Sequence, residues 1–159
     1  MILERLVRTD GGAAPLIARV GLGLVIFPHG AQKVLGIWGG HGLQATMDSF
    51  QQWFGLPYLV TVLVAAAEFL GALALMLGLF SRFVAATLVL VMAGAVILVT
   101  RGHFFMNWYN QPQYGEGFEF HLLAVALGLI VMIRGGGKYS LDALLSRRWK
   151  AEEPIDPPS

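Results

Sequence analysis

The chain has no cysteine and few charged side chains. Of its 159 residues, 13% are charged and 56% are hydrophobic, whereas soluble domains average roughly 25% charged and 45 to 50% apolar residues. The absence of cysteine excludes thiol–disulfide exchange, iron–sulfur clusters, thiolate zinc sites and c-type haem attachment. The net charge is +1, whereas nucleic-acid binding requires a strongly basic domain or surface. The composition therefore predicts one small domain embedded in a lipid bilayer.

Four apolar stretches approach the roughly 20 residues that a helix needs to cross a bilayer. They cover about residues 13–34, 57–79, 83–100 and 118–133, the last being the shortest. Their apolar residues run continuously, whereas the strands of a membrane barrel alternate between polar and apolar residues. We therefore predict an all-α fold, a transmembrane four-helix bundle made by residues 13–146.

The basic residues predict how this bundle is oriented. They lie before the first stretch, between the second and the third, and after the fourth: Arg5, Arg8, Arg82, Arg134, Lys138, Arg147, Arg148 and Lys150. Because short cytoplasmic segments carry an excess of lysine and arginine, we expect both termini to be cytoplasmic. Residues 1–12 are then a cytoplasmic N-terminal segment. The proline-rich and acidic C-terminus predicts a disordered cytoplasmic tail over residues 147–159.

The first connection on the opposite, outer side contains a short amphipathic pattern. Leu43, Met47, Phe50 and Phe54 recur at the spacing of one helix face, and polar residues occupy the other face. This pattern predicts a surface helix, and it is equally consistent with a cap over the bundle and with a gate.

Two ionisable residues fall inside the predicted spans. Arg19 belongs to the first span and Glu68 to the second, and a charge at such a depth costs on the order of 3 kcal/mol. Counted from the cytoplasmic ends at about 1.5 Å per residue, their depths differ by less than the reach of an arginine side chain. We predict a structural intramembrane ion pair between Arg19 and Glu68. A role in ligand or proton handling is the alternative.

A second polar group lies toward the outer side, on segments that are separate in the sequence. Its members are His29, Lys33, His103, Asn107, Glu119 and His121. In four-helix bundles, sites are built by side chains from facing helices. His29 and Lys33 are four residues apart and share a helix face, whereas Glu119 and His121 are two apart and point in different directions. We therefore expect only one of Glu119 and His121 to face His29.

This outer group is a candidate quinone site. The residues proposed for it are His29, Lys33, His103, Glu119 and His121. Imidazole and ammonium groups can hydrogen-bond to quinone carbonyls, and a carboxylate can exchange the protons that accompany quinone reduction. The alternatives are interfacial anchoring and ligation of a haem by two histidines. The sequence has no metal-ligand spacing, so we predict no metal site and do not favour haem.

Several short motifs follow one another along the chain: Ala18-Arg19-Val20-Gly21, His29-Gly30-Ala31-Gln32-Lys33, Gly39-Gly40-His41-Gly42, Gly55-Leu56-Pro57, Ala67-Glu68-Phe69-Leu70-Gly71, Leu77-Gly78-Leu79-Phe80-Ser81-Arg82, His103-Phe104-Phe105, Gly117-Phe118-Glu119, and Gly135-Gly136-Gly137-Lys138-Tyr139-Ser140-Leu141-Asp142. In their order and spacing the chain resembles the DoxX family of small bacterial membrane proteins over about residues 12–146. The family's recurrent polar positions fall on Arg19, His29, Lys33, Glu68, Arg82 and Glu119.

The resemblance implies a four-helix protein of the bacterial inner membrane. Some members of the family are subunits of a thiosulfate:quinone oxidoreductase, or of a membrane complex that handles oxidative or thiol stress. The resemblance therefore implies a similar role for this chain. Quinone is then the implied cofactor, and membrane or soluble redox subunits are the implied partners, with a homo-oligomer left open. Without cysteine, thiol chemistry by this chain itself is excluded, and the sequence shows no independent catalytic motif. We predict an accessory subunit of a quinone-linked oxidoreductase system. The alternative is a non-enzymatic scaffold or small-solute carrier.

Overall fold

The computed structural model describes residues 7–109, 111 and 115–152, and this part of the chain contains helices and no strand. The helices are α2 (Ala13–Leu35), α3 (Gly42–Phe54), α4 (Tyr58–Ala66), the π-helix η1 (Ala67–Gly71), α5 (Ala72–Leu77), α6 (Ser81–Ala95), the π-helix η2 (Val96–Thr100), α7 (Glu119–Arg134) and α8 (Leu141–Glu152). The predicted all-α fold is confirmed.

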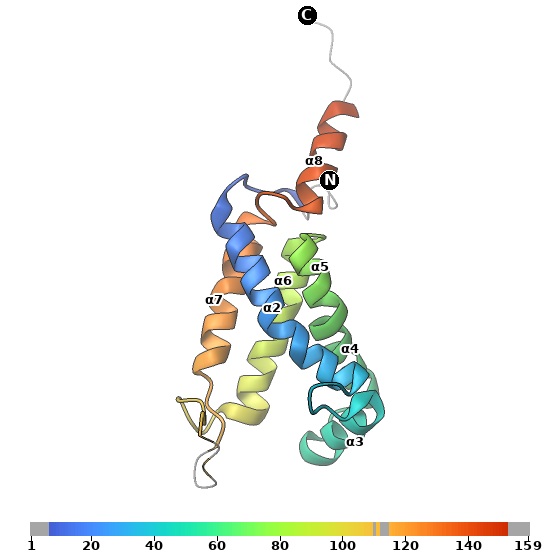
Figure 1. The fold of residues 1–159 in the computed structure, drawn as a ribbon, viewed down its shortest axis with the longest axis vertical. Helices are drawn as coiled ribbons and strands as arrows, with labels where there is room; N and C mark the ends of the chain where they lie inside the picture. Colours follow the sequence, from blue (N-terminus) through green and yellow to red (C-terminus); the bar gives the residue numbers. More distant parts are fainter. Residues whose placement is uncertain (1–6, 110, 112–114, 153–159) are drawn as a thin grey trace, which may run out of the picture.

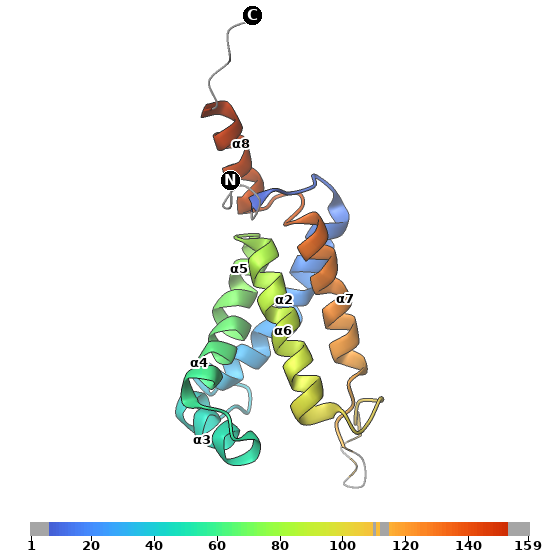
Figure 2. The same ribbon diagram turned by 180° about the vertical axis from the view of Figure 1, so that it is seen from behind.

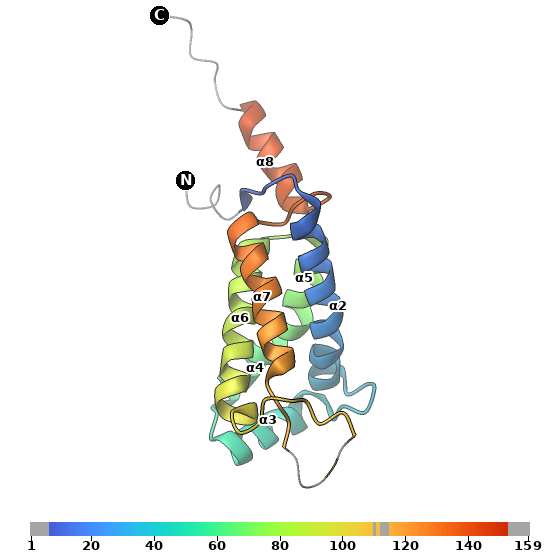
Figure 3. The ribbon, with the colours of Figure 1, turned by 90° about the vertical axis from the view of Figure 1, so that its left-hand side faces the viewer.

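Within the described part of the chain, three helical segments are long and apolar enough to cross a membrane. They are Ala13–Leu35, Tyr58–Leu77 and Ser81–Thr100, with 23, 20 and 20 residues. The fourth long helix, α7, has 16 residues, which correspond to about 24 Å. It lies beside α2 and α6 (Figures 1 and 3). The four segments run along one axis, with α8 at one end and α3 and the loop after η2 at the other (Figure 2). We call these the α8 end and the α3 end.

The hydrophobic core is concentrated toward the α8 end. It is made of small and aliphatic side chains from all four segments: Ala18, Leu22, Ile26, Ala72, Leu75, Ala85, Leu88, Met92, Ala124 and Val131. On the α3 side of Met92 and Ala124, residues 93–99 and 119–123 are all at least partly exposed. The third and fourth segments therefore pack less closely against the others toward the α3 end.

Arg19 holds the α8 end of the bundle together. Its side chain is 2% exposed and donates hydrogen bonds to five backbone carbonyls: those of Gly136 at 2.7 Å, Tyr139 at 3.0 Å, Leu75 and Lys138 at 3.3 Å, and Met76. The last carbonyls of a helix have no partner within it, and a guanidinium group carries five N–H donors. Arg19 thus satisfies the end of α5 and the segment that leads into α8.

The predicted ion pair between Arg19 and Glu68 is wrong. Within the described residues, Arg19 bonds to carbonyls near the α8 end, and Glu68 pairs with Lys33 instead. The prediction compared depths in two straight helices and counted only charged partners. It overlooked the backbone carbonyls at the end of α5, which can accept hydrogen bonds from Arg19.

Asp142 and Ser140 connect α8 to the bundle. The Asp142 carboxylate accepts the backbone N–H groups of Phe80 and Ser81, both at 2.8 Å, and so caps α6. The Ser140 hydroxyl accepts the N–H of Ala143 at 3.1 Å and caps α8. Capped in this way, α8 continues to Glu152. The predicted disorder is therefore wrong for residues 147–152, and residues 153–159 of that predicted tail lie outside the described part of the chain.

The predicted amphipathic helix in the first outer connection is confirmed as α3. None of its residues is buried. It contacts the end of α2 through Thr46, whose hydroxyl donates to the carbonyl of Lys33 at 3.3 Å. It contacts α4 through Asp48, whose carboxylate accepts the Tyr58 hydroxyl at 3.0 Å. These bonds hold α3 across the ends of α2 and α4.

Candidate functional site

An ion pair between Lys33 and Glu68 lies inside the bundle. Lys33 Nζ contacts Glu68 Oε2, and the two side chains are 22% and 6% exposed. Glu68 is ten residues from the start of the segment Tyr58–Leu77 and nine from its end, so it lies near mid-depth, about 15 Å from either end. A carboxylate at this depth requires a partner, because an unpaired charge is poorly tolerated in lipid.

The pair forms where two helix backbones cross. A Cβ atom added to Gly30 would lie 2.6 Å from the Cα of Phe69 and against the backbone of Glu68, so only glycine permits this approach. Lys33 follows Gly30 by one turn, and His29 precedes it directly. The crossing therefore directs both side chains toward Glu68. This signal was present in the sequence, because a glycine between two polar residues of one face indicates a contact with another helix.

The helices that carry the pair contain a π turn and a proline. Glu68 lies in the π-helical turn η1, and Pro28 lies inside α2, one residue before His29. Single π turns are rare in proteins overall, and those that occur are often found at functional sites. A proline inside a helix removes one backbone hydrogen bond and bends the helix. Glu68 lies in the π turn itself, and Pro28 lies five residues before Lys33, so we take this level of the bundle as a candidate site.

Two histidines complete the group. His29 lies beside Phe120, with ring centroids 6.1 Å apart, and interacts electrostatically with Lys33 and Glu68. His121 interacts electrostatically with His29 and Glu68. Its Nδ1 is buried and has no hydrogen-bond partner within the described residues. Of the two candidates on α7, His121 is the one that interacts electrostatically with His29. We call Glu68, Lys33, His29 and His121 the Glu68 cluster.

Glu119 is not part of this cluster. Its Oε1 accepts the backbone N–H of Met106 at 3.0 Å and the indole N–H of Trp108 at 3.2 Å. Glu119 therefore anchors the loop after η2. This is the interfacial anchoring that the sequence left as an alternative to a quinone site. The inclusion of Glu119 in one site with His29 and Lys33 is wrong.

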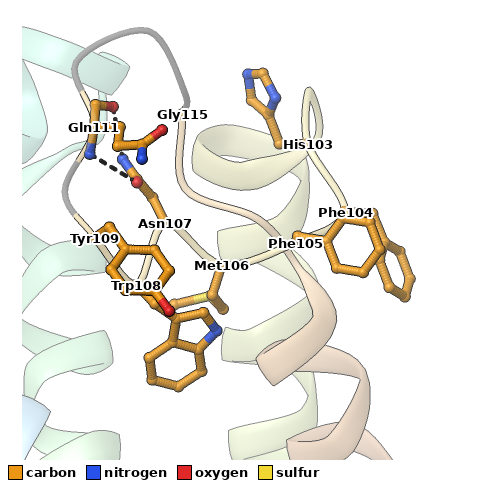
Figure 4. Close-up of a pocket in the computed structure, with 9 residues that line it drawn as sticks. All are labelled: His103, Phe104, Phe105, Met106, Asn107, Trp108, Tyr109, Gln111 and Gly115. Carbon is orange, nitrogen blue, oxygen red and sulfur yellow. Dashed lines mark hydrogen bonds between the residues drawn. The ribbon is translucent and has the colours of Figure 1, made fainter.

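His103 also lies away from the Glu68 cluster. It is exposed and lines a separate pocket of about 410 Å³ in the loop after η2 (Figure 4). The pocket is formed by His103, Phe104, Phe105, Met106, Asn107, Trp108, Tyr109, Gln111 and Gly115. Asn107 stays within this loop, since its amide bonds to the backbone of Gln111. The predicted outer site is thus divided into two places by the structure.

Comparison with known proteins gives the family. Residues 14–101 match the DoxX family. The chain belongs to the DoxX family. A relative from Bacillus subtilis (strain 168), described as putative oxidoreductase CatD, is 32% identical over 80% of this chain and 83% of its own length. A relative from Escherichia coli (strain K12), inner membrane protein YqjF, is 27% identical over 84% of this chain and 93% of its own length. No solved structure gives a significant match.

The apolar helices of this chain, which are long enough to cross a membrane, agree with the description of the E. coli relative as an inner membrane protein. The matched region includes Arg19 and three members of the Glu68 cluster, whereas His121 follows it. Within the part of this DoxX protein that the structure describes, no three histidine, aspartate or glutamate side chains come together in a way that could hold a metal ion.

Replacing Gly30 by alanine should disrupt the crossing that forms the site. The added Cβ meets backbone atoms that cannot turn away, so we expect a loss of about 1 to 3 kcal/mol in the free energy of unfolding. Gly21→Ala in the same helix is the matched control, because a Cβ there meets nothing within 4 Å. Unfolding of both variants in mixed detergent micelles measures the difference. Equal stability of the two variants would contradict the close crossing.

Proposed function

We propose that this DoxX protein is an accessory subunit of a quinone-linked membrane oxidoreductase system, and that the quinone headgroup binds at the Glu68 cluster. The observation that carries the proposal is the ion pair between buried Glu68 and partly buried Lys33, with which two histidines interact electrostatically. An ionisable group in a membrane segment is a candidate functional site, because its burial is unfavourable. Here two such groups lie near an imidazole nitrogen that has no hydrogen-bond partner among the described residues.

The chemistry of the cluster suits a quinone. A quinone is a flat ring with two carbonyl acceptors and a long apolar tail. The ammonium of Lys33 and the N–H groups of His29 and His121 are donors for carbonyl oxygens. Apolar side chains within five residues of the two histidines are exposed on the bundle surface, where a tail can lie: Leu24, Val25, Leu122 and Leu123. Ligand sites in helical bundles are built between helices in the same manner.

The electrons must come from another protein. The chain has no cysteine and therefore no thiol that could be oxidised by a bound quinone. The description of the B. subtilis relative as a putative oxidoreductase supports a redox role. We therefore propose a membrane or soluble partner subunit that supplies or receives electrons, while this chain holds the quinone.

The distribution of basic side chains supports an orientation of the protein in the membrane. Basic side chains gather at the α8 end, where the helices begin or end: Arg8, Arg82, Arg134, Lys138 and Arg147. Because cytoplasmic segments carry the excess of lysine and arginine, we propose that the α8 end is cytoplasmic, and with it both termini. The core-poor α3 end then faces outward, so that quinone reaches the Glu68 cluster from the outer leaflet.

Quinone binding to the purified protein in lipid nanodiscs tests the proposal. We expect saturable binding of a decyl-substituted benzoquinone. Quenching of the intrinsic tryptophan fluorescence measures this binding. His29→Ala removes one hydrogen bond to the ligand and should weaken the affinity about five- to tenfold. His103→Ala is the matched control, because His103 lies in the separate loop pocket, and it should bind like the parent. Absence of saturable binding by the parent would favour the non-enzymatic alternative, a scaffold or small-solute carrier.

A further inference from the structure

We propose that binding of a quinone to the Glu68 cluster takes up one proton, which is carried by Glu68, whereas binding of the corresponding quinol takes up none. This inference rests on the proposed function and adds the protonation that accompanies each form of the ligand. It assigns Glu68 and Lys33 different roles: Lys33 contacts the ligand first, and Glu68 compensates the charge.

The difference in burial between the two partners sets this order. Glu68 is 6% exposed and Lys33 is 22% exposed, and His29 beside them is exposed. A ligand that enters beside His29 therefore meets Lys33 before Glu68. Lys33 is also the flexible partner, because its ammonium is carried on a four-carbon stem, whereas the Glu68 backbone is held against Gly30.

The hydrogen-bonding of the two ligand forms then decides the proton count. A quinone carbonyl only accepts hydrogen bonds, so it draws the Lys33 ammonium away from Glu68. The carboxylate left behind is an unpaired charge inside the bundle, which is unfavourable unless it binds a proton. A quinol hydroxyl can donate a hydrogen bond to the Glu68 carboxylate while Lys33 stays paired with it. The balance is one free proton consumed for each quinone bound and none for each quinol.

The other ionisable groups near Glu68 are few. Helix α2 contributes His29 and Lys33, and α7 contributes His121. The segments α4, η1, α5 and α6 contain Tyr58 and Arg82 besides Glu68, and these two lie ten and fourteen residues from it, at helix starts. Glu68 is thus the carboxylate of the site. The two histidines are the competing proton carriers, because histidine can change charge near neutral pH.

Isothermal titration calorimetry of the protein in nanodiscs measures the proton count. The ligands are the decyl-substituted benzoquinone and its quinol under anaerobic conditions, each titrated in two buffers of different ionisation enthalpy. For the parent we expect about one proton per quinone and about none per quinol, and the quinone dissociation constant should rise by about tenfold per pH unit above neutrality. Glu68→Gln mimics the protonated state, so its quinone affinity should not depend on pH.

The variants separate the carriers of the proton. His29→Gln and His121→Gln should bind quinone more weakly and still take up the proton. Proton uptake that persists in Glu68→Gln and disappears in a histidine variant would overturn the inference. The comparison of quinone with quinol in the parent needs no variant, and equal proton counts for the two ligands would overturn it as well. Binding without proton uptake contradicts only this inference, whereas absence of binding heat for both ligands contradicts the proposed function.

Discussion

Arg19→Met should destabilise the protein by about 3 to 5 kcal/mol. The change keeps an apolar stem of similar length and removes every hydrogen bond to the five carbonyls near the α8 end, which are then left without these donors in a buried place. Arg19→Lys should fall between the parent and Arg19→Met, because an ammonium has three donors and not the planar five of a guanidinium. Unfolding in mixed detergent micelles gives both values.

Arg134→Met is the control for this change. Arg134 pairs with Asp10 at 2.6 Å, but the two side chains are 62% and 48% exposed, so the loss should stay below about 1 kcal/mol. If Arg19→Met were as mild as Arg134→Met, the carbonyl bonds of Arg19 would not be what holds the end of α5 to the segment before α8.

The largest coupling should appear between Lys33 and Glu68. Glu68→Leu leaves the Lys33 ammonium unpaired, and Lys33→Met leaves the carboxylate unpaired, so each single change should cost about 3 to 5 kcal/mol. The double variant removes both charges and should recover most of this loss, because replacing a whole buried pair by apolar side chains is often neutral. The four proteins of this double-mutant cycle are compared by their unfolding free energies in micelles.

A second cycle decides between the two possible partners of Glu68. Within the described residues, Arg19 and Glu68 share no hydrogen-bond or ion-pair partner, so Arg19→Met and Glu68→Leu should add within about 0.5 kcal/mol. Strong coupling in this cycle, together with additivity in the cycle of Lys33 and Glu68, would restore the pairing that the sequence first suggested.

The candidate site could be predicted only in part, for a geometric reason. His29 and Lys33 belong together because a helix repeats every 3.6 residues, and this follows from their spacing alone. The addition of Glu68 depends on where α2 crosses η1, and that crossing is set by Gly30 against the backbone of the other helix. That Glu119 does not belong to the site depends on the path of the loop after η2, which brings Met106 and Trp108 to the Glu119 carboxylate.

The ends of the helices could likewise be predicted from the sequence only in part. The apolar stretches closely match the four long helical segments, since runs of apolar residues and helix length are local properties. The tail was wrong over residues 147–152 because its composition was judged without the caps that begin α8, in which Ser140 takes part. A capped helix can extend into a polar sequence that would not form a stable helix in isolation.

By itself, the sequence determined that this chain is a membrane-embedded helical protein of the DoxX type, because hydrophobicity, helical period and motif order are all written along the chain. It also identified which polar residues had to be explained, since each lies at a depth that lipid makes unfavourable. Only the tertiary structure decided the partners: carbonyls of a helix end for Arg19, Lys33 for Glu68, and a loop for Glu119. Pairing depends on crossing angles and on backbone groups freed at helix ends, and neither is encoded by the spacing of charges in the sequence.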